Sequence, residues 1–338
     1  MQTHFLFDAL SGYAPFEQIV RESGKEQAVI AASGLAGAQK AHLACALSER
    51  TGRPLLFLCE SERAAAQTME DLSALLGGGV SLFPAREITF YQDVAASREV
   101  AYRRIETLRR LVAGKTRAVV APADALLHRV MPRAVFYANT ISLRVGEQVP
   151  TDELLCRLLA AGYTREYMVE GKGQFSVRGG IVDIYPADAP SAVRVEFFDD
   201  EVDSIRQFDV MSQRSQNNLQ EIAIPPATEA PVPQEGVQEL ARVLLAELSR
   251  QEEALRSSAQ EGDGEATLAD LPLEEGEVAV PAAFTRESRT MERFGEKLRA
   301  AVEQMESGVS SRVLEKFIDR LYAQTETILD YMTRPIVV

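Results

Sequence analysis

Histidine, cysteine and long hydrophobic runs are all scarce in this chain of 338 residues. Three histidines are too few for a histidine-rich metal centre. The three cysteines, Cys45, Cys59 and Cys156, lie in apolar segments without the spacing of metal ligands. We therefore expect buried free thiols in a reducing compartment, with no metal site and no cofactor.

A membrane location is also not expected. No apolar stretch reaches the roughly 18 to 20 residues that a membrane-spanning helix needs. Residues 1–10 show no basic segment followed by an apolar one, which is the pattern of a secretory leader. The sequence therefore predicts a cytoplasmic protein without a membrane partner.

Basic residues are outnumbered, since 36 Lys and Arg stand against 50 Asp and Glu for a net charge of −14. Affinity for duplex DNA comes mainly from neutralised phosphates, so we do not expect tight DNA binding by this chain alone. One helix predicted over residues 97–112 is rich in arginine, but Glu99 and Glu106 dilute its charge. We interpret it as a helix with a solvated basic face. Its arginines are Arg98, Arg103, Arg104, Arg109 and Arg110.

Residues 1–140 alternate strand and helix signals, which is typical of a parallel sheet with crossover helices. Short apolar runs predict strands at residues 27–32, 54–59, 80–83 and 118–121. Periodic or capped segments predict helices at residues 39–50, 61–76, 97–112 and 122–130.

The pattern changes near residue 140 and predicts an inserted antiparallel α+β domain at residues 141–224. A helix at residues 151–161, with Thr151 as its N-cap, precedes closely spaced strands at residues 174–177, 181–185, 193–198 and 202–208. Residues 225–338 are predicted to return to the first domain, and the apolar ending favours a segment of a longer protein. The expected elements are a proline-rich connector to residue 233, helices at 234–255, 291–305 and 309–329, an acidic loop at 260–277 and a strand at 334–338.

Residues 34–41 read GLAGAQKA, an altered form of a phosphate-binding loop. A working loop has a glycine before its lysine and a Ser or Thr after it, which close around phosphates and hold Mg²⁺. Gly34, Gly37 and Lys40 are present, but Gln39 and Ala41 stand at those two positions. The motif predicts weak anion binding at most, so we expect no ATP hydrolysis and no enzyme in this region.

One strand of the inserted domain combines arginine with an exposed aromatic. Strand alternation places Arg194, Glu196 and Phe198 on the face opposite Val193, Val195 and Phe197. Arginine and aromatic residues are enriched at binding hot spots. Charged residues on a sheet face are also often merely solvated, so this pattern leaves a protein interface and a solvated face both open.

A second strand adds to the same surface. Alternation turns Gln174, Ser176 and Arg178 outward, while Phe175 faces the core. We expect Gly179–Gly180 to reset the phase of the chain as a bulge. Two neighbouring segments thus offer arginines on a polar face.

These strands carry a resemblance to a known family. The segments GQFSVRGGIVDIYP at residues 173–186 and RVEFFDDEVDSIR at residues 194–206 are similar to domain 2 of the excision-repair helicase UvrB. They resemble even more the matching domain of the bacterial transcription-repair coupling factors. The resemblance extends over essentially the whole chain. It implies an α/β fold with a P-loop helicase-like parallel-sheet domain, degenerate in its loop and split around the insertion.

Two features separate the coupling factors from UvrB. UvrB has an intact phosphate-binding loop and a long aromatic-rich hairpin that grips damaged DNA. Residues 84–96 of this chain, with Phe90 and Tyr91, are too short for such a hairpin. The sequence therefore resembles the coupling factors, and an ATP- or DNA-binding fragment of a UvrB-type repair helicase is the alternative.

The resemblance implies a non-catalytic adaptor that recruits the repair protein UvrA through the inserted domain. The family's contact positions, two arginines and a phenylalanine, fall on Arg178, Arg194 and Phe198. Strand position alone adds Glu196 and Arg206. In the full-length family protein, RNA polymerase and DNA bind other domains, and a C-terminal domain masks the UvrA-binding surface.

Overall fold

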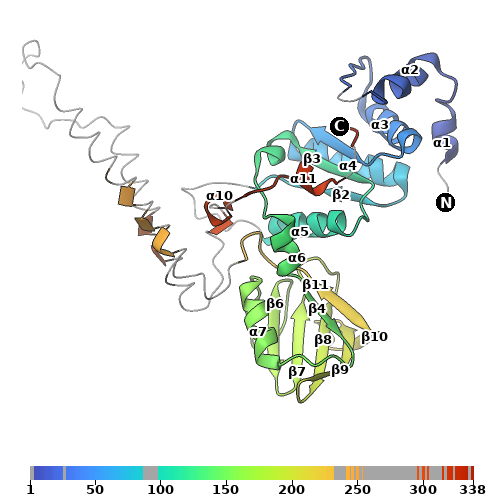
Figure 1. Cartoon of the computed structure of the whole chain (residues 1–338). Coiled ribbons are helices and arrows are strands. Elements are labelled where there is room, and N and C mark those ends of the chain that lie inside the picture. Colours follow the sequence, from blue (N-terminus) through green and yellow to red (C-terminus); the bar gives the residue numbers. More distant parts are fainter. Residues whose placement is uncertain are drawn as a thin grey trace, which may run out of the picture.

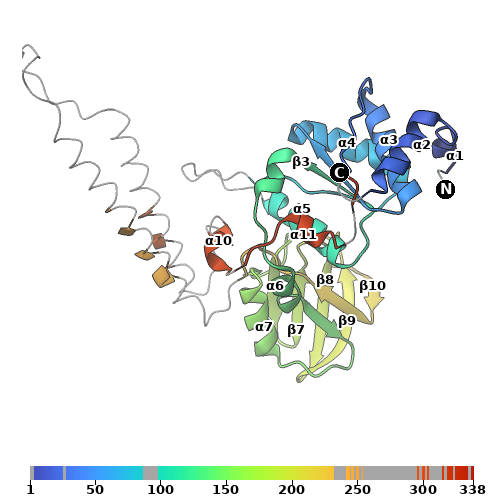
Figure 2. The same cartoon turned by 45° about the horizontal axis from the view of Figure 1, so that its top comes forward.

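The computed structural model describes residues 4–25, 28–86 and 98–231, together with parts of residues 241–338. Most of these residues form two lobes (Figure 1). The labelled ends of the chain both lie on the upper lobe, and Figure 2 shows the same arrangement from a second direction. None of the helices described is both long and apolar enough to cross a membrane.

The upper lobe is built on a parallel sheet with the strand order β1-β3-β2. Its strands are β1 (Leu55–Cys59), β2 (Val80–Leu82) and β3 (Ala118–Pro122). Its helices are α1 (His4–Asp8), α2 (Ala14–Ser23), α3 (Gly37–Thr51), α4 (Glu62–Leu76), α5 (Arg98–Val112), a 3₁₀ helix (Ala123–Leu127) and α6 (Arg133–Ala138). Strand β3 is buried on both faces, because Val119 packs in the cluster that contains α5 residues and Val120 in the one that contains α4 residues.

The predicted first strand at residues 27–32 is wrong over residues 28–32, which form no strand. Val29 is 98% exposed. The free edge of β1 is instead taken by the end of the chain: Leu56 N–H donates to Val337 O at 2.7 Å, and Val337 N–H donates to Pro54 O at 3.0 Å. An edge strand has one open row of hydrogen-bonding groups, so only one segment occupies this place.

The lower lobe is a mixed, mainly antiparallel sheet with the strand order β10-β9-β8-β7-β6-β5, packed against α7. A separate two-stranded ribbon, β11-β4, leads into and out of it. The elements are β4 (Ile141–Arg144), α7 (Thr151–Ala160), β5 (Thr164–Arg165), β6 (Gln174–Arg178), β7 (Ile181–Tyr185), β8 (Ala192–Phe198), β9 (Glu201–Phe208), β10 (Ser215–Leu219) and β11 (Glu221–Ile224).

Three local predictions in these lobes need correction. Pro150, not Thr151, holds the N-cap position of α7. Gly179–Gly180 is a two-residue hairpin turn between the paired residues Arg178 and Ile181. The two glycines form the turn itself, and neither is the extra residue of a bulge. Cys156 is exposed, whereas the other two cysteines are buried as expected.

Helix α5 lies between the lobes and contacts both (Figure 1). The Tyr102 hydroxyl donates to Lys172 O at 2.9 Å, and Arg109 pairs with Asp188. Gly173 has φ +74° and lies so close to Tyr102 that an added Cβ would be 2.1 Å from the hydroxyl oxygen. A larger residue would push α5 away, so glycine is required for this approach.

The described residues from 314 onward return to the upper lobe through α10 (Ile318–Leu321) and α11 (Ile328–Tyr331). The single helix predicted at residues 309–329 is wrong, because Glu326 pairs with Val130 as an isolated bridge between α10 and α11. Helical residues occur within both predicted helices, 234–255 and 291–305. The predicted loop at 260–277 and the segment 87–96 lie outside the described residues.

A buried carboxylate joins the lobes where the chain leaves β11. Glu229 is 0% exposed and receives hydrogen bonds from two arginines. Arg104 Nε donates to Oε1 at 2.5 Å, and Arg86 Nη2 donates to Oε2 at 2.6 Å. Arg104 belongs to α5 and Arg86 follows β2, so one carboxylate ties the exit of the insertion to two parts of the upper lobe.

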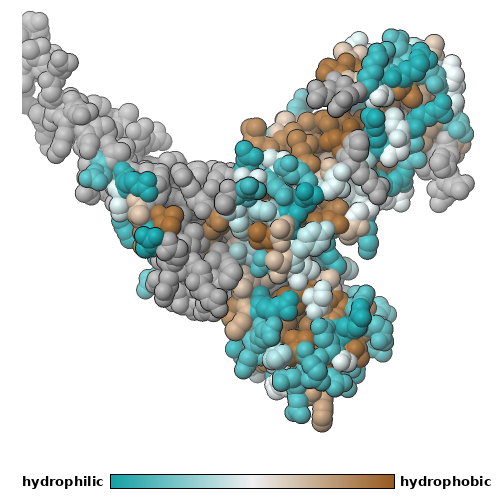
Figure 3. All heavy atoms as spheres, viewed as in Figure 1, coloured by the Kyte–Doolittle hydropathy of each residue, from teal (hydrophilic) through white to brown (hydrophobic). Residues whose placement is uncertain are grey.

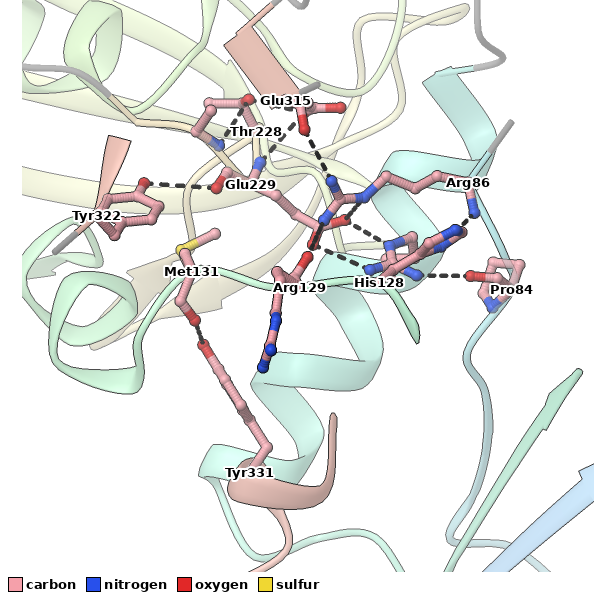
Figure 4. Close-up of polar contacts among 12 residues, drawn as sticks. Pro84, Arg86, His128, Arg129, Met131, Thr228, Glu229, Glu315, Tyr322 and Tyr331 are labelled. Atoms are coloured by element: carbon pink, nitrogen blue, oxygen red, sulfur yellow. Dashed lines mark hydrogen bonds and ion pairs between the residues drawn. The ribbon is translucent and has the colours of Figure 1, made fainter. Parts of the chain in front are cut away.

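Further donors and acceptors complete this cluster (Figure 4). Arg86 also donates to the carbonyl oxygens of Glu315 and Arg129, and its backbone N–H donates to His128 Nδ1. The Thr228 hydroxyl donates to the Glu315 carboxylate at 2.7 Å. Buried charges are tolerated when they are paired and hydrogen-bonded, which is the condition met here.

The same cluster corrects the prediction that the α5 arginines form a solvated face. Arg104 is 0% exposed, lies 3.9 Å from the centroid of the Phe83 ring and donates to Pro84 O at 2.7 Å. Its neighbours on α5 do form surface pairs, Arg103 with Glu99 and Arg110 with Glu106. The helix is therefore basic outside and carries one structural arginine inside.

We predict that Glu229→Gln lowers the free energy of unfolding by about 3–5 kcal/mol, because it leaves the fully buried Arg104 guanidinium without its carboxylate partner. Urea unfolding followed by circular dichroism measures this change. The control is Glu99→Gln, which removes an exposed partner of Arg103 and is expected to cost less than about 1 kcal/mol. Equal effects of the two variants would contradict the assignment.

The pH dependence gives an independent check of the same prediction. Burial alone raises the pKa of Glu229, but the charges and hydrogen bonds of Arg104 and Arg86 outweigh it and lower the pKa to about 2. The stabilisation is therefore complete above about pH 4.3, the pKa of a glutamate in the unfolded chain. It is lost as the pH falls towards 2. The stability gap between wild type and Glu229→Gln should shrink over this acidic range.

Candidate functional site

The outward face of the lower sheet gathers the residues that the sequence singled out. We call Arg178, Arg194, Glu196, Phe198 and Arg206 the polar face. Strand register aligns Arg194 on β8 with Arg206 on β9, and Glu196 lies opposite Ser204. Arg178 pairs with Ile181, which in turn pairs with Glu196, so β6, β8 and β9 all contribute to one side.

Arg194 is held in place by a buried carboxylate on the neighbouring strand. Its Nε and Nη2 donate to the two Asp183 oxygens at 2.7 and 2.8 Å, a bidentate ion pair. Asp183 is only 4% exposed. The Gln213 side chain accepts a third bond at 3.2 Å, and the guanidinium carbon lies 4.7 Å from the centroid of the Phe208 ring. The hydrogen bonds to Asp183 raise the pKa of Arg194, so its charge is fixed.

Glu196 and Arg206 form a second pair on this face, with 3.2 Å between Oε2 and Nη2. The Ser204 hydroxyl donates to the same Glu196 oxygen at 2.8 Å. Both charged side chains are partly exposed, so solvent screens the pair and it adds little to stability. It fixes a carboxylate and a guanidinium side by side on the surface.

Phe198 and Arg178 are the exposed members of the polar face. Phe198 is 75% exposed at the end of β8, just before the Asp199–Asp200 hairpin turn. Arg178 is exposed at the end of β6, where the Gly179–Gly180 turn begins. The turn lies against β8, because Phe197 N–H donates to Gly180 O at 2.7 Å.

The structure adds residues to this site that the sequence did not single out. Ser176, predicted to lie on the outward face, is opposite Asp183 in the sheet and is only 1% exposed. A lone Asp between apolar residues of a strand is a signal for Asp183. Tyr167 beside Arg178 has no such signal, since exposed tyrosines are common in loops.

The altered phosphate-binding loop has a local structure of its own. Helix α3 begins at Gly37, and the Gln39 side chain accepts a hydrogen bond from Ala36 N–H at 3.0 Å. The Ala36 N–H at the start of α3 is thus satisfied within the loop itself. Ala41 is buried in a core cluster and offers only a methyl group. Gly34 and Lys40 are both exposed.

A groove of about 570 Å³ lies beside this loop and is lined mainly by apolar side chains, including Ile30, Leu43, Phe57 and Val337. Hydrophobic residues gather on this part of the upper lobe, around the C-terminal end of the chain (Figure 3). Lys40 also lines the groove, and none of the described residues that line it is acidic.

The buried Glu229 cluster lacks the solvent access that a catalytic site needs. Glu229 has a strongly lowered pKa, which often marks active sites, but its carboxylate is buried and fully hydrogen-bonded. Within the described part of the chain, no group of three or more His, Cys, Asp or Glu side chains is arranged to hold a metal ion. The polar face is thus the best candidate for a functional surface.

Parts of this chain are similar to known proteins. Residues 141–229 match the family described as the UvrB interaction domain. The transcription-repair-coupling factor of Bacillus subtilis is 36% identical over 211 residues, which cover 62% of this chain and 18% of that protein. The Myxococcus xanthus protein of the same name is 36% identical over 226 residues, 64% of this chain and 19% of that protein.

The chain therefore spans less than a fifth of the length of these curated relatives. The polar face lies wholly inside the matched residues 141–229. The chain is thus similar to part of the transcription-repair-coupling factors, and its residues 141–229 match the UvrB interaction domain.

Proposed function

We propose that this chain is a non-catalytic adaptor region of a transcription-coupled repair factor and that it recruits UvrA through the polar face. The observation that carries the proposal is the exposed pair of Phe198 and Arg178 on a domain that matches the UvrB interaction domain. The name of the curated relatives supports the link to transcription-coupled repair. RNA polymerase and DNA would bind other parts of such a protein.

An exposed phenylalanine supports a protein partner. Covering the Phe198 ring in a complex removes apolar area from water, and aromatic side chains contribute much of the energy at hot spots. Charged residues neighbour the ring in the sequence, with Glu196 before it and Asp199 and Asp200 after it.

The internal ion pairs support a prepared surface. Arg194 is locked by Asp183 and Gln213, and Arg206 is held by Glu196. Ordering a flexible side chain on binding costs about 0.5–1.5 kcal/mol, and a side chain that is already ordered avoids this loss. Their remaining exposed edges give the partner a fixed pattern of charge.

The upper lobe is proposed to be a scaffold derived from a P-loop helicase fold, with its ligand loop disabled. The bond from Ala36 N–H to Gln39, the buried methyl of Ala41 and the mainly apolar groove support this reading. Among the described residues, no observation favours the alternative of an ATP- or DNA-binding fragment of a UvrB-type helicase.

We predict that Phe198→Ala weakens the binding of purified UvrA by about 2 kcal/mol, roughly thirtyfold in Kd. Surface plasmon resonance with immobilised UvrA measures it. The matched control is Leu127→Ala, which truncates a side chain that is 81% exposed on the upper lobe. Unchanged affinity of the Phe198 variant would rule out the polar face.

Arg194→Ala is a less clean test of the same surface. It leaves the buried Asp183 carboxylate unpaired and therefore destabilises the domain as well as the interface. Arg178→Ala breaks no ion pair with a described residue and is the better arginine variant. Circular dichroism of each variant separates loss of fold from loss of binding.

We predict no measurable binding of Mg-ATP by titration calorimetry at micromolar protein concentration. The reason is that Gln39 replaces the glycine before Lys40 and that Ala41 carries no hydroxyl for Mg²⁺. Intact UvrB, with a working loop, is the positive control. Binding in the micromolar range by this chain would favour the helicase alternative.

A further inference from the structure

The arginines of the polar face differ in how much of their charge is already neutralised. Arg194 is paired with Asp183, and Arg206 is paired with Glu196. Arg178 has no carboxylate within ion-pair distance among the described residues, and its only side-chain hydrogen bond there goes to a backbone oxygen. Arg178 is therefore the guanidinium on this face with a charge left for a partner.

Tyr167 supports the Arg178 side chain from the edge of the sheet. The Arg178 guanidinium carbon lies 5.8 Å from the centroid of the Tyr167 ring, and Nη2 donates to Tyr167 O at 3.5 Å. Strand β5 runs parallel to β6, with Arg165 opposite Phe175, so the residues after Arg165 run alongside the end of β6. An arginine over an aromatic face within about 6 Å is attracted by the ring.

Tyr167 has no evident role in the stability of the fold. Its side chain is 92% exposed, so it buries almost no apolar area against the domain. The next residue, Met168, is 39% exposed and extends the apolar surface. An aromatic side chain left in water beside an arginine without a counter-charge has the composition of an interface anchor.

The pair also lies in line with the rest of the polar face. Arg178 pairs with Ile181 and Ile181 with Glu196, so two strand spacings, roughly 10 Å, separate Arg178 from the residues of β8. Phe198 is two residues beyond Glu196 on that strand. Arg178 thus has an exposed aromatic on each side, Tyr167 at the sheet edge and Phe198 at the end of β8.

We propose that Tyr167 and Arg178 act as one unit that extends the docking surface to the sheet edge and binds a carboxylate flanked by an apolar side chain on the partner. The ring orients the guanidinium before binding and then covers the apolar neighbour of the carboxylate. Arg178 supplies the positive charge for this contact, because Arg194 and Arg206 are already paired with Asp183 and Glu196. The inference rests on the proposed function, because it extends the same surface and names the chemistry of its partner.

The test measures the affinity of the full chain for immobilised purified UvrA by surface plasmon resonance. Tyr167→Ala should weaken binding about tenfold, as expected for a cation–π contact that becomes desolvated. Tyr167→Phe keeps the ring and should bind as wild type. Tyr13→Ala, which truncates a tyrosine that is 57% exposed on the upper lobe, is the matched control and should have no effect.

A double-mutant cycle distinguishes a unit from two independent contacts. In the Arg178→Ala background, Tyr167→Ala should cost much less than tenfold, because the arginine that it orients is gone. Additive effects, or wild-type affinity of Tyr167→Ala, would overturn this inference. If Phe198→Ala still weakens binding in that case, the proposed function stands, whereas wild-type protein that does not bind UvrA would contradict both.

Discussion

The buried ion pairs of Glu229 with Arg104 and Arg86 are the constraint on which the arrangement of the two lobes depends. Glu229 lies at the exit of the inserted domain, far in the sequence from α5 and from the end of β2. The ion pairs join these three parts of the chain. Replacing such a cluster with apolar residues is often tolerated, but removing one partner leaves a buried charge. The cluster therefore specifies one arrangement of the lobes more than it adds net stability.

The polar face uses the same kind of interaction for a different purpose. Asp183 holds Arg194 from within the sheet, and Glu196 holds Arg206 on the surface. The side chains with freedom to contact a partner are Phe198 and Arg178, at the ends of β8 and β6. A rigid sheet thus carries a few exposed groups in fixed positions, which suits recruitment of another protein. In the upper lobe, the Gln39 side chain accepts a hydrogen bond from the Ala36 N–H at the start of α3.

The strands and helices of the lower lobe could be predicted because alternation and turn residues act locally, and the outward position of Arg194 and Phe198 followed from them. The burial of Arg104 could not, since its partner Glu229 is 125 residues away and a helical arginine normally faces water. The absence of a strand at residues 28–32 also involves a distant residue, because Val337 occupies the edge of β1. The pairing of Ser176 with Asp183 needed the register of β6 and β7.

Photo-crosslinking to purified UvrA from a benzophenone amino acid at position 198 tests the central claim most directly. The account predicts a crosslink to UvrA from this position and none from position 127 on the upper lobe, which has a similarly exposed side chain. A crosslink from position 127 with none from position 198 would contradict the account, because it would place the partner away from the polar face.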